Sequence, residues 1–219
     1  MSYCLKVYPV FLVLLFTACS GNNREPMTDR DGNSYHTVTI GGRVWAAENL
    51  TVSRYRNGDS IPEVNDPGKW SGLTDGAWCW YSNNSENGKS YGKLYNWYAV
   101  NDPRGLAPEG WHVATDGDWS SLSEALGGDE VSGGKLKADR FWKEADSLEG
   151  KSGMALLPSG ARRDTDGEFV LMGEYSRHWT SSEINAGRAW AWAVGYFDKA
   201  LRRGEAAKRL GFAVRCVKD

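Results

Sequence analysis

The residues with side chains suited to catalysis are few and lie far apart in this sequence. His36, His112 and His178 are the three histidines, and none lies in an HExxH, HxxxH or CxxC pattern that would bind a metal. His112 and His178 each adjoin a tryptophan, and their spacing indicates no serine or carboxylate partner for nucleophilic catalysis. We therefore expect all three to be hydrogen-bonded structural residues, and we expect the protein not to be an enzyme.

Two acidic clusters carry oxygen ligands of the kind that Ca²⁺ prefers. One spans residues 29–33, and the other consists of Asp164, Asp166 and Glu168. Neither has the twelve-residue loop that ends in a bidentate glutamate. Because Asp-Gly pairs between strands are typical of tight turns, we expect turns at both places. Asp164, Asp166 and Glu168 remain weak calcium candidates, and no other cofactor is expected.

The tryptophans are the most unusual feature of the composition, with 11 in 219 residues. Wide indole rings either fill an irregular core or present flat apolar faces to a ligand. Trp70 and Tyr55 lie in a stretch rich in turn-forming residues, 51–76, which we expect to be a long surface loop. They are the first candidates for a ligand-binding surface. Trp190 and Trp192, which share one face of a predicted strand, are the second.

The elements that must position these residues are short. Residues 35–45 predict a β-hairpin around a Gly-Gly turn. Thr115 and Asp118 have the spacing of a capping box, followed by an amphipathic helix that a second Gly-Gly pair ends. The segment through Lys89 is expected to be a loop. One main capped helix among short antiparallel strands and long loops predicts an α+β fold. The strands of the C-terminal half are expected at 169–171, 178–181, 189–197 and 211–217.

The N-terminal residues have the pattern of an export signal. An uncharged apolar run, residues 7–16, follows Lys6 and has the length of a signal-peptide core, too short to cross a bilayer as a helix. The sequence then reads Thr-Ala-Cys19, which resembles the lipobox of bacterial lipoproteins. We expect a signal peptide over 1–18, lipidation at Cys19 and a polar tether over 19–28. An ordinary signal peptide with an incidental cysteine is the alternative.

The rest of the chain, 29–219, contains no linker or repeat, so we expect one domain. Ser20 does not resemble the aspartate associated with inner-membrane retention, so an outer-membrane lipoprotein is expected, on the periplasmic face or the cell surface. A net charge of −2 gives no long-range field for nucleic acid. The expected partners are the membrane, through the lipid anchor, and a glycan or an envelope protein. Nothing in the sequence indicates an oligomeric state.

The four cysteines divide by position. Cys4 would leave with the signal peptide and Cys19 would carry lipid, which leaves Cys79 and Cys216 in a compartment where disulfides persist. A bond between them would close a long loop and contribute on the order of 4–5 kcal/mol in the chain-entropy model. Two separately buried free thiols are the alternative.

Blocks of recognisable sequence follow one another along the chain, at residues 29–33, 44–50, 79–81, 91–100, 108–113, 133–137, 179–183 and 211–217. Together they resemble the Fibrobacter succinogenes major paralogous domain of exported bacterial proteins, over residues 29–219. Ala107 stands where that family usually has a cysteine. If the missing cysteine is the usual partner of Cys79 or Cys216, those two need not bond to each other. Six tryptophans of the blocks are expected in the core: Trp45, Trp80, Trp97, Trp111, Trp119 and Trp179.

Residues 110–115 and the closing block 211–217 are also similar to formylglycine-generating enzymes, and this resemblance implies a C-type-lectin-like fold. Those oxidases hold copper with a nearby pair of cysteines late in the domain, whereas this chain has no cysteine between Cys79 and Cys216. The Glu-Pro-Asn and Trp-Asn-Asp signatures of calcium-dependent sugar binding are also absent.

These patterns favour a non-catalytic, lipid-anchored envelope protein that binds a glycan or a protein through its loops, as in carbohydrate binding or adhesion. Two alternatives stay open at this point. One is an enzyme related to the formylglycine-generating oxidoreductases, and the other is a purely structural envelope lipoprotein.

Overall fold

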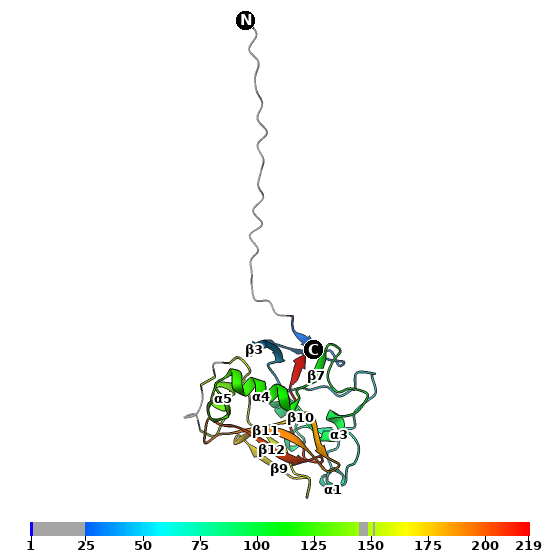
Figure 1. Cartoon of the computed structure of the whole chain (residues 1–219). Coiled ribbons are helices and arrows are strands. Elements are labelled where there is room, and N and C mark those ends of the chain that lie inside the picture. Colours follow the sequence, from blue (N-terminus) through cyan, green and yellow to red (C-terminus); the bar gives the residue numbers. More distant parts are fainter. Residues whose placement is uncertain (2–24, 145–148, 151) are drawn as a thin grey trace.

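The computed structural model describes residues 1, 25–144, 149–150 and 152–219 (Figure 1). The expected signal peptide, the lipidation site Cys19 and most of the tether lie outside the described residues. The helices are α1 (Pro67–Ser71), α2 (Ser85–Tyr91), α3 (Trp97–Val100), α4 (Asp116–Ala125) and α5 (Asp129–Leu136), with a 3₁₀ turn at Tyr81–Asn83. The strands are β1 (Met27–Thr28), β2 (Ser34–Tyr35), β3 (Thr37–Ile40), β4 (Arg43–Ala46), β5 (Trp78–Cys79), β6 (Leu94–Tyr95), β7 (Trp111–Val113), β8 (Ser159–Arg162), β9 (Phe169–Met172), β10 (Tyr175–Asn185), β11 (Arg188–Gly195), β12 (Leu201–Ala207) and β13 (Cys216–Lys218).

The expected α+β class is confirmed, because the helices are short and the named strands pair antiparallel. The two largest sheets have the strand orders β3-β4-β13-β7 and β10-β11-β12. In the first, Val217 of the C-terminal strand pairs with Trp45 on one side and His112 on the other. Figure 1 shows β13, in red, between the β3–β4 hairpin and β7. The C-terminal strand therefore joins segments from the first and middle parts of the chain.

The predicted hairpin is confirmed and its turn has a simple steric cause. Ile40 pairs with Arg43 across Gly41 and Gly42, whose φ angles are +58° and +79°. Two consecutive positive φ angles define the type I′ turn, which suits the right-handed twist of the strands and favours glycine. At Gly41 a Cβ atom would also lie 2.9 Å from that of Ala125, so the turn packs closely on the end of α4.

The predicted capped helix is confirmed as α4. The Thr115 hydroxyl accepts a bond from the backbone N–H of Asp118, and the Asp118 carboxylate accepts one from the backbone N–H of Thr115. Helix α5, which the sequence pattern did not indicate, follows after a two-glycine turn. It contains Gly133, where a Cβ atom would lie 2.5 Å from the carbonyl oxygen of Ala200. Close packing against the chain before β12 thus explains a helix with low intrinsic propensity.

Two expected loops contain helices. Helix α1 lies within 51–76 and begins at Asp66, whose side chain accepts a hydrogen bond from the backbone of Lys69. Helix α2 occupies the segment through Lys89 and begins at Asn84, which caps the backbone of Glu86. Asn, Ser, Asp and Gly favour caps and turns more than helix interiors. Because these residues are abundant in both segments, the sequence predicted loops where the structure has the short capped helices α1 and α2.

The core is built largely from aromatic side chains. Trp45 meets Trp119 edge-on with ring centres 5.3 Å apart, and Trp179 packs on Phe212 at 4.6 Å. Of the tryptophans expected in the core, Trp80 is half-buried, and the others are buried: Trp45, Trp97, Trp111, Trp119 and Trp179. In the described ranges, no helix has the length and apolar character needed to cross a membrane.

Candidate functional site

Trp70, the first sequence-derived candidate, is completely buried. Its indole N–H donates to the carbonyl oxygen of Arg209 at 2.9 Å, and the Arg162 guanidinium lies 4.5 Å from its ring centre. Arg162 is itself buried and donates to the carbonyl oxygens of Val64, Asn65 and Gly167. The expectation that Trp70 presents a free ring to a ligand is wrong, because its polar surroundings in sequence fold against a distant strand.

Tyr55 is also buried, so it offers no ring face to solvent. The guanidinium of Arg104 lies 4.1 Å from its ring centre, and Arg104 is held there by a two-point contact with Asp102 at 2.8 Å. The Tyr55 hydroxyl occupies the space that a Cβ atom would need at Gly76. Burial raises the pKa of Tyr55. The expectation that Tyr55 belongs to an exposed binding loop is wrong, because this ring, like that of Trp70, is buried against other parts of the chain.

The two tryptophans of β11 differ in exposure. Trp192 is buried, and its indole N–H donates to the carboxylate of Asp116 at 3.0 Å. Trp190 is half-buried, and the Arg203 guanidinium lies 3.3 Å from its ring centre. Arg203 also makes a two-point contact with Asp116 at 2.8 and 2.7 Å. Of the four aromatic candidates, Trp190 alone keeps part of its surface exposed, and a side chain already covers its ring.

The acidic clusters form turns. Asp166 binds Arg163 at 2.9 Å and accepts the backbone N–H of Glu168 at 3.1 Å. Asp29 accepts the backbone N–H groups of Asp31 and Asn33, each at 3.0 Å. Among the residues that the structure describes, no group of three or more His, Cys, Asp or Glu side chains is arranged to hold a metal ion.

Cys79 and Cys216 are free thiols, and both are buried. Cys79 packs in a small cluster with Trp70 and Leu94, whereas Cys216 lies in the main core. The proposed disulfide between them is therefore not formed, and the alternative of two separate buried thiols holds. Burial raises the pKa of each thiol to about 12.

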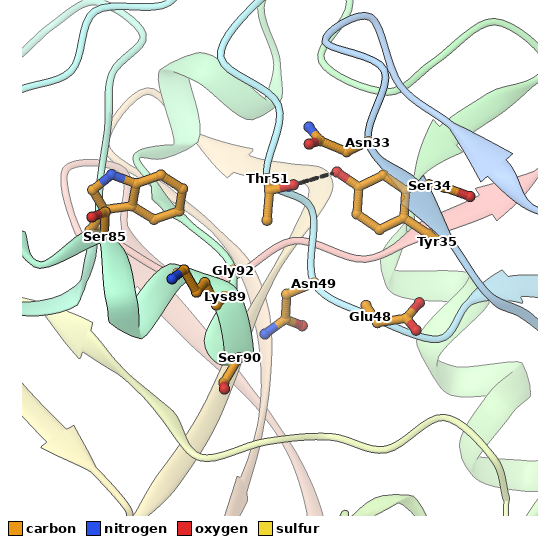
Figure 2. A pocket seen from close by; sticks show the side chains of 12 residues that line it. Asn33, Ser34, Tyr35, Glu48, Asn49, Thr51, Ser85, Lys89, Ser90 and Gly92 are labelled. Carbon is orange, nitrogen blue, oxygen red and sulfur yellow. Dashed lines mark hydrogen bonds between the residues drawn. The ribbon is translucent and has the colours of Figure 1, made fainter.

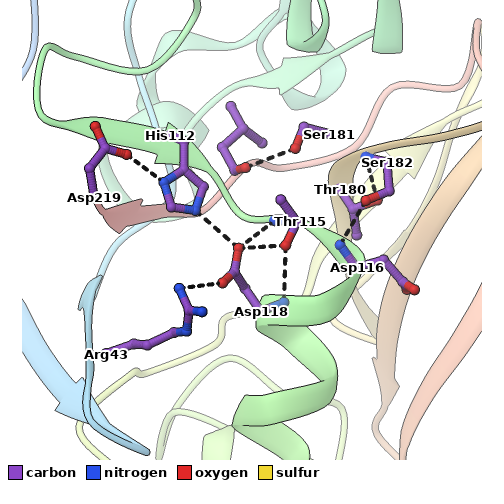
Figure 3. A network of polar contacts seen from close by, with 10 residues as sticks. Arg43, His112, Thr115, Asp116, Asp118, Thr180, Ser181, Ser182 and Asp219 are labelled. Carbon is purple, nitrogen blue, oxygen red and sulfur yellow. Dashed lines mark hydrogen bonds and ion pairs between the residues drawn. The ribbon is translucent and has the colours of Figure 1, made fainter.

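His112 has carboxylate partners that its sequence context does not reveal (Figure 3). Its Nε2 atom lies 3.0 Å from Asp118, and its Nδ1 atom lies 2.7 Å from Asp219. Arg43 binds the other oxygen of Asp118 at 2.9 Å. The network joins the β3–β4 hairpin, the cap of α4 and the C-terminal residue. It leaves neither imidazole nitrogen free to act as a base.

His178 lies in the core against Trp119, with its Nε2 atom 2.8 Å from the Ser176 hydroxyl. Burial lowers the pKa of His178 well below its ordinary value. A nucleophile must reach its substrate, and both members of this serine–histidine pair are buried. We interpret the pair as a structural hydrogen bond.

An open cleft lies on another part of the surface (Figure 2). Figure 2 shows the segment 48–51 between Lys89 and Ser90 of α2 and Ser34 and Tyr35 of β2. Its volume is about 470 Å³. The lining is dominated by polar side chains and one indole: Asn33, Ser34, Tyr35, Glu48, Asn49, Thr51, Trp80, Ser85, Gly88, Lys89, Ser90 and Gly92.

Trp80 is held in the wall of this cleft by close packing. Its ring meets that of Trp78 edge-on, with centres 5.2 Å apart. On another side the backbone of α2 approaches so closely that a Cβ atom at Gly88 would overlap the indole. Gly88 is therefore required for this contact, and the half-buried indole keeps a fixed position.

The polar wall is also fixed by internal hydrogen bonds. The Tyr35 hydroxyl donates to Asp29 at 2.5 Å and lies 2.7 Å from the Thr51 hydroxyl. The Asn49 amide donates to the carbonyl oxygen of Tyr91 at 2.8 Å and accepts from the Arg215 Nε at 2.7 Å. These bonds orient the side chains before any ligand arrives.

A second pocket, of about 480 Å³, adjoins the first and shares with it Glu48, Asn49, Lys89 and Ser90. Its other lining residues are His36, Ala47, Arg140, Gly153, Ala155, Leu157 and Arg215. None of the cleft residues was a glycan-binding candidate from the sequence, although Asn33 belongs to the acidic cluster at 29–33. The aromatic sequence blocks indicated core positions, and no local pattern places α2 opposite residues 48–51.

Comparison with known families agrees with the sequence resemblance. Residues 38–218 match the family model of the Fibrobacter succinogenes major domain. Comparisons with curated proteins and with solved structures gave no match. Because the family model covers most of the 219 residues, the chain belongs to the Fibrobacter succinogenes major domain family.

Proposed function

We propose that this protein is a non-catalytic, lipid-anchored protein of the bacterial envelope that binds a glycan in the cleft beside Trp80. The observation that carries the proposal is the fixed, half-buried Trp80 indole in a cleft lined otherwise by hydrogen-bonding side chains. A sugar ring has an apolar C–H face and a rim of hydroxyl groups. An indole suits the first, and hydroxyl, amide and carboxylate side chains suit the second.

The rigidity of the site supports binding. Tyr35, Thr51 and Asn49 are oriented by bonds to other parts of the protein, so little side-chain entropy is lost when a ligand binds. The hydroxyls of Ser34 and Ser90, by contrast, make no hydrogen bond within the described part of the chain. They are available to exchange water for ligand hydroxyl groups.

The arrangement of the reactive side chains favours binding over catalysis. His112 engages carboxylates through both ring nitrogens, and the Ser176–His178 pair is buried. Cys79 and Cys216 belong to different core clusters, so they do not supply a paired copper site like that of the formylglycine-generating oxidases. These observations weigh against the enzyme alternative.

The envelope location rests on sequence, and the finer fold assignment rests on sequence together with the order of the strands. The Thr-Ala-Cys19 sequence supports a lipid anchor, with residues 1–18 as the signal peptide and the outer membrane as the destination. The placement of β13 between β4 and β7 joins distant parts of the chain, as expected of a C-type-lectin-like domain. Mass spectrometry of the membrane-extracted protein tests the anchor: the diacylated mass of a chain beginning at Cys19 is expected, and Cys19→Ser abolishes it.

Glycan-array screening followed by titration calorimetry tests the proposed function. Wild type is expected to bind, and Trp80→Ala is expected to lose binding. Because Trp80→Ala removes packing on Trp78, Ser90→Trp provides a second variant that fills the cleft from an exposed position. Phe197→Ala removes an exposed ring that does not line the cleft and is the matched control. If both cleft variants bind as tightly as wild type, the assignment of the cleft is wrong.

A further inference from the structure

The two adjoining pockets differ in charge. The pocket beside Trp80 has one lysine and one glutamate in its lining, Lys89 and Glu48. The second pocket shares these two and adds three basic residues, His36, Arg140 and Arg215. Its one carboxylate, that of Glu48, already lies 2.6 Å from the Nδ1 atom of His36. The second pocket therefore has an excess of basic groups although the whole chain carries a net charge of −2.

Arg215 supplies a cation that forms no ion pair with a carboxylate among the described residues. Its guanidinium is buried and donates to Asn49 and to the carbonyl oxygens of Ala46, Ala47, Met154 and Ala155. Burial lowers the pKa of Arg215 to about 9, so it stays protonated at neutral pH. Its hydrogen bonds are satisfied by neutral groups, and the pocket carboxylate that acts on its charge at longer range is Glu48.

Two further cations line the second pocket, Lys89 and Arg140. Arg140 is exposed, and within the described ranges it contacts no carboxylate. Lys89 is exposed on α2, where it pairs with Glu86 at 2.7 Å, a solvent-exposed contact that holds weakly. Both side chains are long and have free or exchangeable donors. They can bind an anion in the pocket that Arg215 also lines.

We propose that the two pockets are consecutive subsites for an acidic oligosaccharide, in which a sugar ring lies against Trp80 and the carboxylate of a neighbouring uronic acid unit lies between Lys89 and Arg140. The inference rests on the proposed glycan-binding function and adds the chemical class of the glycan. The shared residues Glu48, Asn49, Lys89 and Ser90 make the two pockets continuous, so one chain of linked sugars can occupy both. No covalent step is involved.

The test compares uronic acid oligosaccharides with the same oligosaccharides after methyl esterification, which removes the charge and keeps the sugar rings. Titration calorimetry with the full-length protein in detergent measures both forms. Wild type is expected to bind the acidic form about tenfold more tightly, the size of one charge-assisted hydrogen bond. The preference is expected to shrink as salt is added. Arg140→Gln and Lys89→Gln are each expected to remove most of the preference, because each weakens binding of the acid form more than binding of the ester.

Controls separate the possible failures. Lys69→Gln removes an exposed lysine on α1, outside both pockets, and is expected to keep the full preference. Equal affinity of wild type for the acid and the ester, with binding still lost in Trp80→Ala, overturns the inference and leaves the proposed function standing. Absence of binding to every oligosaccharide of the panel, charged and neutral, overturns both. Lys89 and Arg140 are exposed, so both variants are expected to fold. Their unfolding temperatures check this.

Discussion

The ammonium nitrogen of Lys93 lies 3.5 Å from the centre of the Trp78 ring and 4.9 Å from that of Trp80. Lys93 is 2% exposed, and its ammonium also donates to the Ser53 hydroxyl. Indole faces carry partial negative charge and attract a cation, most strongly where water is excluded. The buried lysine thus helps to hold both indoles in place. One of them is the ring that lines the cleft.

This position makes stability depend on pH in a specific direction. Burial lowers the pKa of Lys93 from 10.5 to about 8. Between these values the unfolded chain binds more protons than the folded one, so the contribution of Lys93 to the free energy of unfolding rises with pH. The quantity to compare is the free energy of unfolding of Lys93→Met minus that of wild type. We expect this difference to be largest below pH 8 and to fall by about 1–3 kcal/mol as the pH approaches 10.5.

Urea unfolding followed by tryptophan fluorescence at a series of pH values measures this difference. The comparison with wild type is needed because buried thiols and phenols act in the opposite direction. Burial raises the pKa of Tyr35, Cys79 and Cys216, so their contribution falls at high pH in both proteins. The exposed Lys69→Met is the control. A pH-independent difference between Lys93→Met and wild type would contradict the prediction.

Trp70→Ala is expected to destabilise the protein by about 3–5 kcal/mol, the usual cost of truncating a buried tryptophan. The variant loses the hydrogen bond to the Arg209 carbonyl and the ring on which the Arg162 guanidinium packs. Chemical denaturation measures the loss. A Trp70→Ala protein with unchanged stability and abolished glycan binding would instead support the interpretation based on sequence.

Local sequence patterns predicted the elements that short-range backbone geometry and hydrogen bonds specify. The hairpin at Gly41 and Gly42 and the capping box of Thr115 and Asp118 are confirmed because backbone conformation and short-range hydrogen bonds specify them. Helix α5 was missed because its support comes from contact between Gly133 and the chain before β12. Short helices depend mainly on tertiary packing, which no window of sequence contains.

The candidate site was missed for a similar reason. Trp70 has polar neighbours in sequence but an apolar and cationic environment in space, supplied by Arg162 from β8. Trp80 lies in an aromatic run that suggests a core strand, yet the chain turns after β5 and leaves it half-buried. Composition indicates how much aromatic surface must be covered. It does not indicate which individual ring remains uncovered.

Both thiols are expected to be unreactive in the folded protein. In a Cys4→Ser/Cys19→Ser protein, a thiol-specific chromogenic reagent should detect almost no reaction until denaturant is added, and then Cys79 and Cys216 together. Burial limits access, and a pKa of about 12 leaves little thiolate at neutral pH. Added reductant should leave the unfolding temperature unchanged. A fall in that temperature would show that the two cysteines pair after all.

Asp118→Asn is expected to destabilise the protein by about 1–3 kcal/mol at neutral pH, because one carboxylate serves the cap of α4 and the contacts with Arg43 and His112. Burial alone would raise the pKa of Asp118, but the hydrogen bonds from Thr115 and His112 outweigh it and hold the pKa below 3.8. The stabilisation is therefore present above pH 3.8 and is lost as the pH falls through the lower folded value.

Acid titration of the free energy of unfolding checks the sign. The difference between wild type and Asp118→Asn should be constant from neutral pH down to about pH 4 and should narrow below it. Asp139→Asn, at an exposed position, is the control and should follow wild type throughout. A difference that widens as the pH falls would mean that Asp118 binds its proton more readily in the folded state. In that case His112 and Arg43 would not be stabilising a charged carboxylate. Other contacts would then hold the hairpin, helix α4 and the C-terminal strand together.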